Sequence, residues 1–128
     1  MSNMKNVVCI SPNGNQKVIS IDIKNPKYCD LLGCKEVDGF SLMHFDPYGY
    51  KLAVIVDDFG IVNEFNRFVS NLSLREVHGD AILIDDDMDL SLEKIKELSN
   101  ILSKDFSKIM ERKNRKIPLK FFEDLLKD

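Results

Sequence analysis

The stretch AILIDDDMDLSLEKIKELSNIL, residues 81–102, decides the fold class because it joins two different hydrophobic patterns. Its first four residues form a continuous apolar run, which is typical of a short strand buried on both faces. From Leu92 onward apolar residues recur at helical spacing, and Ser91 can serve as the N-cap. We therefore predict a buried strand, central in a sheet, followed by a helix of about 20 residues.

The chain before this stretch predicts further strands, at residues 6–10, 17–23, 37–45 and 50–56. The first two are β-branched runs joined by Pro12-Asn13-Gly14, which is typical turn chemistry, so they predict a hairpin. Asn25-Pro26 can start a short helix that continues to about Leu32 and ends at Gly33. The last two strands pair around a turn at residues 46–49.

Asp57-Asp58-Phe59-Gly60 contains the three letters that mark the magnesium-binding segment of protein kinases. A kinase also needs a glycine-rich loop, a strand lysine and an HRD segment, and the sequence has none of them. The interpretation is a turn between two strand runs, with Gly60 free to take positive φ. Residues 65–72 then follow helical spacing, with Asn63 as the candidate cap.

These elements predict an α+β domain over residues 1–112. It has a mostly antiparallel sheet of five to six strands, a short helix, and a long C-terminal helix packed on the sheet. A chain of 128 residues needs only one core. Residues 113–128 are predicted to form a basic linker and a short terminal helical appendage that begins at Pro118.

Composition excludes several classes of protein. Apolar residues make up 44% and charged residues 30%, which is typical of globular domains. A net charge of −3 argues against a general binder of nucleic-acid backbones. No apolar run is long enough to span a membrane, so we expect a cytoplasmic protein. Cys9, Cys29 and Cys34 form no CxxC pair and are expected to be reduced.

The acidic run at residues 85–89 is the first place to look for a metal. Asp85, Asp87 and Asp89 match the first three ligand positions of an EF-hand loop, but Leu90 and Lys96 stand where that loop needs glycine and glutamate. We expect solvated carboxylates near the N-terminus of the long helix. A Mg²⁺ or Ca²⁺ site remains the alternative, and no cofactor is predicted.

The sequence assigns no catalytic residue. His44 and Asp46 would share one face of a strand, as in an oriented general base, but no GxSxG elbow supplies a nucleophile. Neither a Walker loop nor GxGxxG occurs. The chain is therefore predicted not to be an enzyme.

The C-terminal segment is the predicted contact surface for a partner. Its apolar residues need a docking surface, because short isolated helices are marginal in water. That surface is either the chain's own core, a second protomer in a homodimer, or a host protein. The predicted contact residues are Lys113, Arg115, Lys116, Phe121, Phe122 and Leu125.

Residues 7 to about 97 resemble a family known as domain of unknown function 3846, found in phages, plasmids and related mobile elements of Gram-positive bacteria. The resemblance rests on the order of four marks: the first strand running into residues 11–14, the turn at residues 57–60, Asn63 directly after it, and residues 77–84 followed by acids and a helix. In the family pattern a segment with proline and small residues follows the asparagine, whereas the corresponding segment here is bulky.

The resemblance implies a mobile-element origin and an accessory function, and it carries no catalytic residues. We expect a non-enzymatic phage or mobile-element protein that blocks a host protein of a defence or regulatory system. The alternative is a protein that sequesters a small ligand or nucleotide. A third hypothesis is a metal-dependent hydrolase that uses Asp85, Asp87 and a histidine.

Overall fold

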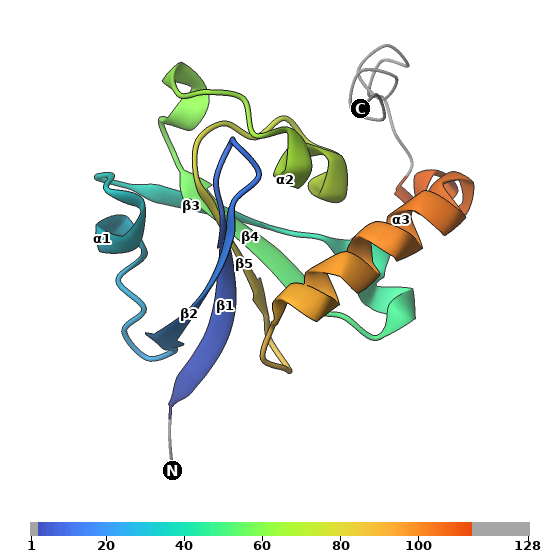
Figure 1. The fold of residues 1–128 in the computed structure, drawn as a ribbon, viewed down its shortest axis with the longest axis horizontal. Coiled ribbons are helices and arrows are strands. Elements are labelled where there is room, and N and C mark those ends of the chain that lie inside the picture. The colour runs from blue at the N-terminus through green and yellow to red at the C-terminus, as the bar shows by residue number, and fades with distance from the viewer. Residues whose placement is uncertain (1–2, 114–128) are drawn as a thin grey trace.

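The computed structural model describes residues 3–113 and confirms the α+β class, with one antiparallel five-stranded sheet and helices on both of its faces (Figure 1). The strands are β1 (Met4–Ile10), β2 (Gln16–Asp22), β3 (Val37–Ser41), β4 (Leu52–Asp57) and β5 (Ala81–Asp85). The α-helices are α1 (Tyr28–Leu32), α2 (Arg67–Ser73) and α3 (Leu92–Lys113), and the 3₁₀ helices are η1 (Met43–Tyr48) and η2 (Gly60–Val62).

The strand order β2-β1-β5-β4-β3 places β5 at the centre of the sheet. β5 pairs antiparallel with β1 on one side and with β4 on the other. Ala81, Ile82 and Leu83 are each at most 1% exposed, as a strand covered on both faces requires. The prediction of a buried central strand is therefore confirmed.

The predicted hairpin of β1 and β2 is also confirmed. Gly14 has φ 90° in its turn and donates its N–H to the carbonyl oxygen of Ser11 at 2.9 Å. Glycine adopts this left-handed conformation without a steric cost, which is why the turn closes here.

Alternation along β1 divides the apolar side chains between the two faces of the sheet. Val8 and Ile10 belong to the main core, which α2 and α3 cover. Val7 lies in a smaller cluster on the other face, where Tyr28 and Leu32 of α1 pack. Figure 1 shows the same asymmetry, with α1 on one side of the sheet and α3 on the other.

The long helix begins where the sequence predicts, because the Ser91 side-chain oxygen accepts a hydrogen bond from the Lys94 N–H at 3.3 Å. Ile95, Leu98 and Leu102 are buried on one stripe of the helix. The backbone leaves helical geometry at Asp105, with φ −113° and ψ 23°. There the carboxylate of Asp105 accepts a hydrogen bond from the Tyr48 hydroxyl of η1 at 2.9 Å.

Two predicted boundaries are wrong. The strand predicted at residues 37–45 ends at Ser41, and η1 begins at Met43. Pro47 lies inside η1 and has no N–H for a strand ladder, which favours a helical turn over an extended pair. The short helix starts at Tyr28 rather than at Asn25-Pro26, although Gly33 ends it as predicted.

The prediction around residues 58–66 is correct in part. β4 does end in a turn, but the segment after it is η2 rather than a strand. Gly60 does not take positive φ; a Cβ there would lie only 3.1 Å from the carbonyl oxygen of His78, so the position requires a close backbone approach. The cap of α2 is Asn66, not Asn63.

Within residues 3–113, no helix is long and apolar enough to cross a membrane.

Candidate functional site

Asp85 is fully buried and is a structural residue of the turn that follows β5. One carboxylate oxygen accepts the Lys51 N–H at 2.8 Å. The other accepts the N–H groups of Asp87 at 2.8 Å and Met88 at 3.2 Å. Three charge-assisted hydrogen bonds offset the cost of burying the carboxylate. The sequence analysis expected a solvated side chain here, and that expectation is wrong.

The neighbouring acids also have structural partners. Asp89 accepts the backbone N–H of Asn6 at 2.9 Å, and exposed Asp87 lies 3.5 Å from the Lys51 ammonium. Among the residues that the structure describes, no group of three or more His, Cys, Asp or Glu side chains could hold a metal ion. Asp85 and Asp89 therefore stabilise the turn between β5 and α3 by accepting hydrogen bonds from backbone N–H groups.

His44 lies in the core, 6% exposed, with Nε2 3.0 Å from the carbonyl oxygen of Leu72. It belongs to η1, so the strand geometry that would have aligned it with Asp46 does not exist. Cys9, Cys29 and Cys34 are free thiols. Burial raises the pKa of the Cys9 thiol, which disfavours the reactive thiolate.

The predicted partner-binding residues are not brought together in the described structure. Lys113 is the last residue of α3. The remaining five, Arg115, Lys116, Phe121, Phe122 and Leu125, lie outside the described residues. Their role stays a prediction.

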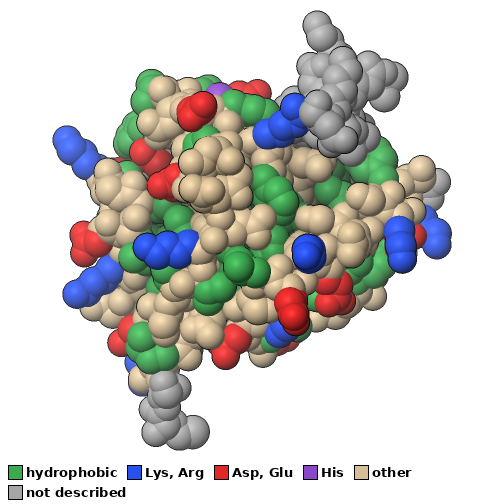
Figure 2. Space-filling model, viewed as in Figure 1, with side chains coloured by type: hydrophobic (Ala, Val, Ile, Leu, Met, Phe, Trp, Pro, Cys, Tyr) green, Lys and Arg blue, Asp and Glu red, His purple; other side chains and the backbone are tan. Residues whose placement is uncertain are grey.

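The structure places a different group of apolar side chains on the surface. Phe59, Ile61 and Val62 of the η2 segment, residues 59–62, are 62%, 74% and 87% exposed. Single exposed apolar residues are ordinary, but three within four positions place much exposed apolar surface on one short segment, and exposed apolar patches mark interaction sites. Figure 2 shows hydrophobic and acidic side chains together with a histidine at the end of the molecule where this segment lies.

A cleft of about 230 Å³ opens beside the η2 segment. The end of β4, the edge strand β3 and the loop before β5 form its walls. Its apolar lining includes Phe40, Val56 and Val77. Its polar lining is mostly acidic, and consists of Asp38, Asp57, Asp58, Glu76 and His78.

His78 connects the cleft to the η2 segment. Its Nδ1 lies 3.0 Å from the carbonyl oxygen of Asn63, and its Nε2 lies 2.7 Å from a carboxylate oxygen of Glu76. Both neighbours are acceptors, and a neutral imidazole has only one N–H, so both bonds form together only in the imidazolium. The hydrogen bond to Glu76, followed by that to Asn63, raises the pKa of His78 against the opposing effect of burial.

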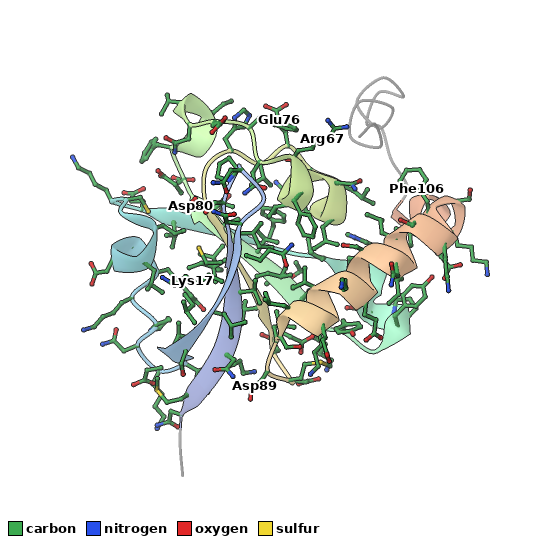
Figure 3. All side chains as sticks on the ribbon, in the orientation of Figure 1. Lys17, Arg67, Glu76, Asp80, Asp89 and Phe106 are labelled. Atoms are coloured by element: carbon green, nitrogen blue, oxygen red, sulfur yellow. The ribbon has the colours of Figure 1, made fainter. Side chains whose placement is uncertain are left out.

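The loop that contains Glu76 lies far from the acidic run at residues 85–89. Figure 3 shows Glu76 and Asp89 at opposite ends of the molecule. The chain therefore has two separate acidic regions with different surroundings. The first lines an open cleft beside apolar side chains. The second binds backbone N–H groups.

Sequence reasoning missed the patch because it assigned Ile61-Val62 to a strand, which would have paired and half-buried them. One signal was available: Phe59, Ile61 and Val62 directly follow the turn residues Asp57-Asp58, and two isolated residues are too few for a strand. The cleft itself is lined by residues that lie as far apart in the sequence as Asp38 and His78, and local patterns do not reveal that these residues meet.

Comparison with known proteins bears on the fold alone and indicates no family and no activity. No protein-family model matches the chain, and no curated protein matches it. Among solved structures, it is similar to a chain titled small RNA methyltransferase HEN1, with a TM-score of 0.61 and 17% sequence identity. The match covers 80% of this chain and 17% of the methyltransferase chain. At that identity, the likeness concerns the fold alone.

Proposed function

We propose that this chain is a non-enzymatic accessory protein of a phage or mobile element that binds and blocks a host protein of a defence or regulatory system. It acts in the cytoplasm of the host cell. The family resemblance from the sequence, to domain of unknown function 3846, is part of this proposal. One observation carries it: the exposed apolar side chains of the η2 segment, beside an open cleft.

Burial of such side chains supplies the favourable free energy of protein association, at about 25 cal/mol for each Å² of apolar surface removed from water. An isolated monomer gains nothing from Val62 at 87% exposure. A partner that covers this residue and Phe59 would gain from it. The acidic lining of the neighbouring cleft repels phosphate groups, which disfavours the alternative of nucleotide sequestration at this site.

The test is capture of a partner from a lysate of a Gram-positive host by the tagged full chain. We expect a host protein to be captured by the wild type and lost with the double variant Phe59→Ser/Val62→Ser. The matched control, Met43→Ser/Leu92→Ser, removes two apolar side chains that are 70% and 48% exposed elsewhere, and should retain the partner.

A further variant that lacks residues 114–128 tests the contact surface predicted from the sequence. If the truncated chain still captures the same protein, the C-terminal segment is not the contact surface. Light scattering tests the homodimer, which would account for the apolar terminal helix predicted from the sequence without a foreign partner. A thermal shift with cyclic or linear nucleotides, or with Mg²⁺ or Ca²⁺ and reversed by EDTA, would contradict the proposed function.

A further inference from the structure

We infer that the cleft beside the η2 segment receives an arginine side chain of the partner, while an apolar residue two positions from that arginine packs on Ile61. This inference rests on the proposed function and specifies the chemistry of the partner: an extended protein segment with a large apolar residue two positions from an arginine.

Charge is the first argument. Four carboxylates line the cleft, those of Asp38, Asp57, Asp58 and Glu76. Two basic side chains lie beside them: the ring of His78, 2.7 Å from a carboxylate oxygen of Glu76, and the guanidinium of Arg75, which lies over the Phe40 ring. One oxygen of Asp57 accepts the N–H of Phe59 at 2.9 Å. The side chains of Asp38 and Asp58 are exposed at the rim. The cleft therefore keeps a surplus of negative charge that a cation from outside can neutralise.

The apolar lining is the second argument. Phe40 and Val56, which are only partly buried, suit the aliphatic stem of a long basic side chain, whose charged head would reach the exposed carboxylates of the cleft. Arginine fits better than lysine, because a guanidinium is more weakly hydrated and stacks on aromatic rings. The guanidinium of Arg75 already lies 4.1 Å from the centre of the Phe40 ring, so the partner's arginine would have to use the part of that ring that Arg75 leaves uncovered.

The neighbouring apolar residue is the third argument. Ile61 lines the cleft and is 74% exposed, so it is available to an apolar side chain of the segment that places arginine in the cleft. Successive residues of an extended segment point in opposite directions, and residues two apart point the same way. An arginine and an apolar residue two positions away can therefore contact the cleft and Ile61 together.

The probe is a fluorescein-labelled peptide, Gly-Ser-Arg-Ser-Leu-Ser-Gly, which has leucine two positions from arginine and is titrated with the full chain by fluorescence anisotropy at about 50 mM and about 500 mM NaCl. The matched peptide has glutamate in place of arginine. We expect the arginine peptide to bind at low salt, to weaken at high salt, and the glutamate peptide not to bind. Equal binding of both peptides would overturn the inference.

Two pairs of variants locate the site. Asp38→Asn/Asp58→Asn should weaken binding about fivefold or more, whereas Asp86→Asn/Asp87→Asn, which changes net charge equally at the other acidic region, should change it less than about twofold. Ile61→Ser should weaken binding, and Met43→Ser, at a site of similar exposure, should not. Equal weakening by both double variants would mean attraction by net charge alone and would overturn the inference.

The same variants separate this inference from the proposed function. A host protein that is captured equally by wild type, Asp38→Asn/Asp58→Asn and Ile61→Ser would overturn the inference and leave the proposed function standing. Failure of the wild type to capture any host protein, with specific peptide binding intact, would overturn the proposed function and support the arginine-accepting cleft. We expect each variant to fold, because the substituted side chains are exposed, and circular dichroism checks this.

Discussion

Asn66 joins β1 to α2: its side-chain nitrogen Nδ2 donates a hydrogen bond to the carbonyl oxygen of Ile10 at 3.0 Å, across 56 positions of sequence. The same nitrogen donates to the carbonyl oxygen of Gly79 at 2.8 Å. The side-chain oxygen accepts the N–H of Val69 at 3.1 Å and so caps α2. One fully buried amide therefore holds together the end of β1, the start of α2 and the loop before β5.

Replacement of Asn66 by alanine should lower the free energy of unfolding by about 3 kcal/mol, because it removes the cap and the side-chain hydrogen bonds to two buried carbonyl oxygens. Urea unfolding followed by circular dichroism measures the change. Asn100→Ala, at an exposed position of α3, is the control and should change stability by less than about 0.5 kcal/mol. If Asn66→Ala also lowered the free energy of unfolding by less than about 0.5 kcal/mol, water would have replaced the hydrogen bonds of the side chain.

Asp85→Ala should destabilise the protein by about 3 kcal/mol, because three backbone N–H groups lose their acceptor at a buried site. Asp87→Ala should change stability by less than about 1 kcal/mol, since its ion pair with Lys51 is exposed. Thermal unfolding of both variants and the wild type, with Ca²⁺, Mg²⁺ or EDTA, makes the comparison. A rise in melting temperature with either cation that Asp85→Ala abolishes would restore the metal-site hypothesis.

The parts of the fold that depend on local patterns were predictable. The apolar run at residues 81–84 indicated a central strand, and the spacing after Ser91 indicated α3, because in both cases the pattern itself describes which faces are buried. Gly14 and Gly33 correctly indicated a turn and a helix end, because both positions have positive φ, which glycine adopts without a steric cost.

The parts that depend on contacts between distant segments were not predictable. Position 60 requires glycine because the carbonyl oxygen of His78 lies close to its backbone. Asn66 caps α2 and also donates a hydrogen bond to the carbonyl oxygen of Ile10 in β1. Asp85 reads as one of four similar acids in the sequence, and only the fold shows that backbone N–H groups from Lys51 and Met88 surround it. The cleft depends in the same way on β3, β4 and the loop at residues 76–78 meeting at one edge.

Lys27 is exposed and has φ 53°, a left-handed conformation that costs a residue with a Cβ about 1 kcal/mol. Lys27→Gly should therefore raise the free energy of unfolding by up to about 1 kcal/mol. Lys24→Gly, in the same exposed loop but without positive φ, should lower it slightly, because glycine adds entropy to the unfolded chain. Urea unfolding of the two variants side by side decides between relief of strain and a general effect of glycine.

The imidazolium of His78 should make stability depend on pH in a defined direction. Its pKa in the folded protein is raised above the ordinary value of about 6.5, chiefly by the Glu76 carboxylate. Its contribution to stability is therefore fully present below about pH 6.5 and is lost as pH rises through the folded pKa. The difference in unfolding free energy between wild type and His78→Gln should be larger at about pH 5.5 than at about pH 9.

Nuclear magnetic resonance of the ring protons should show the His78 pKa falling toward the ordinary value in Glu76→Gln, with Glu93→Gln in α3 as the control. A wild-type pKa at or below the ordinary value would mean that His78 holds Asn63 as a neutral ring, and that the η2 segment is fastened equally at every pH.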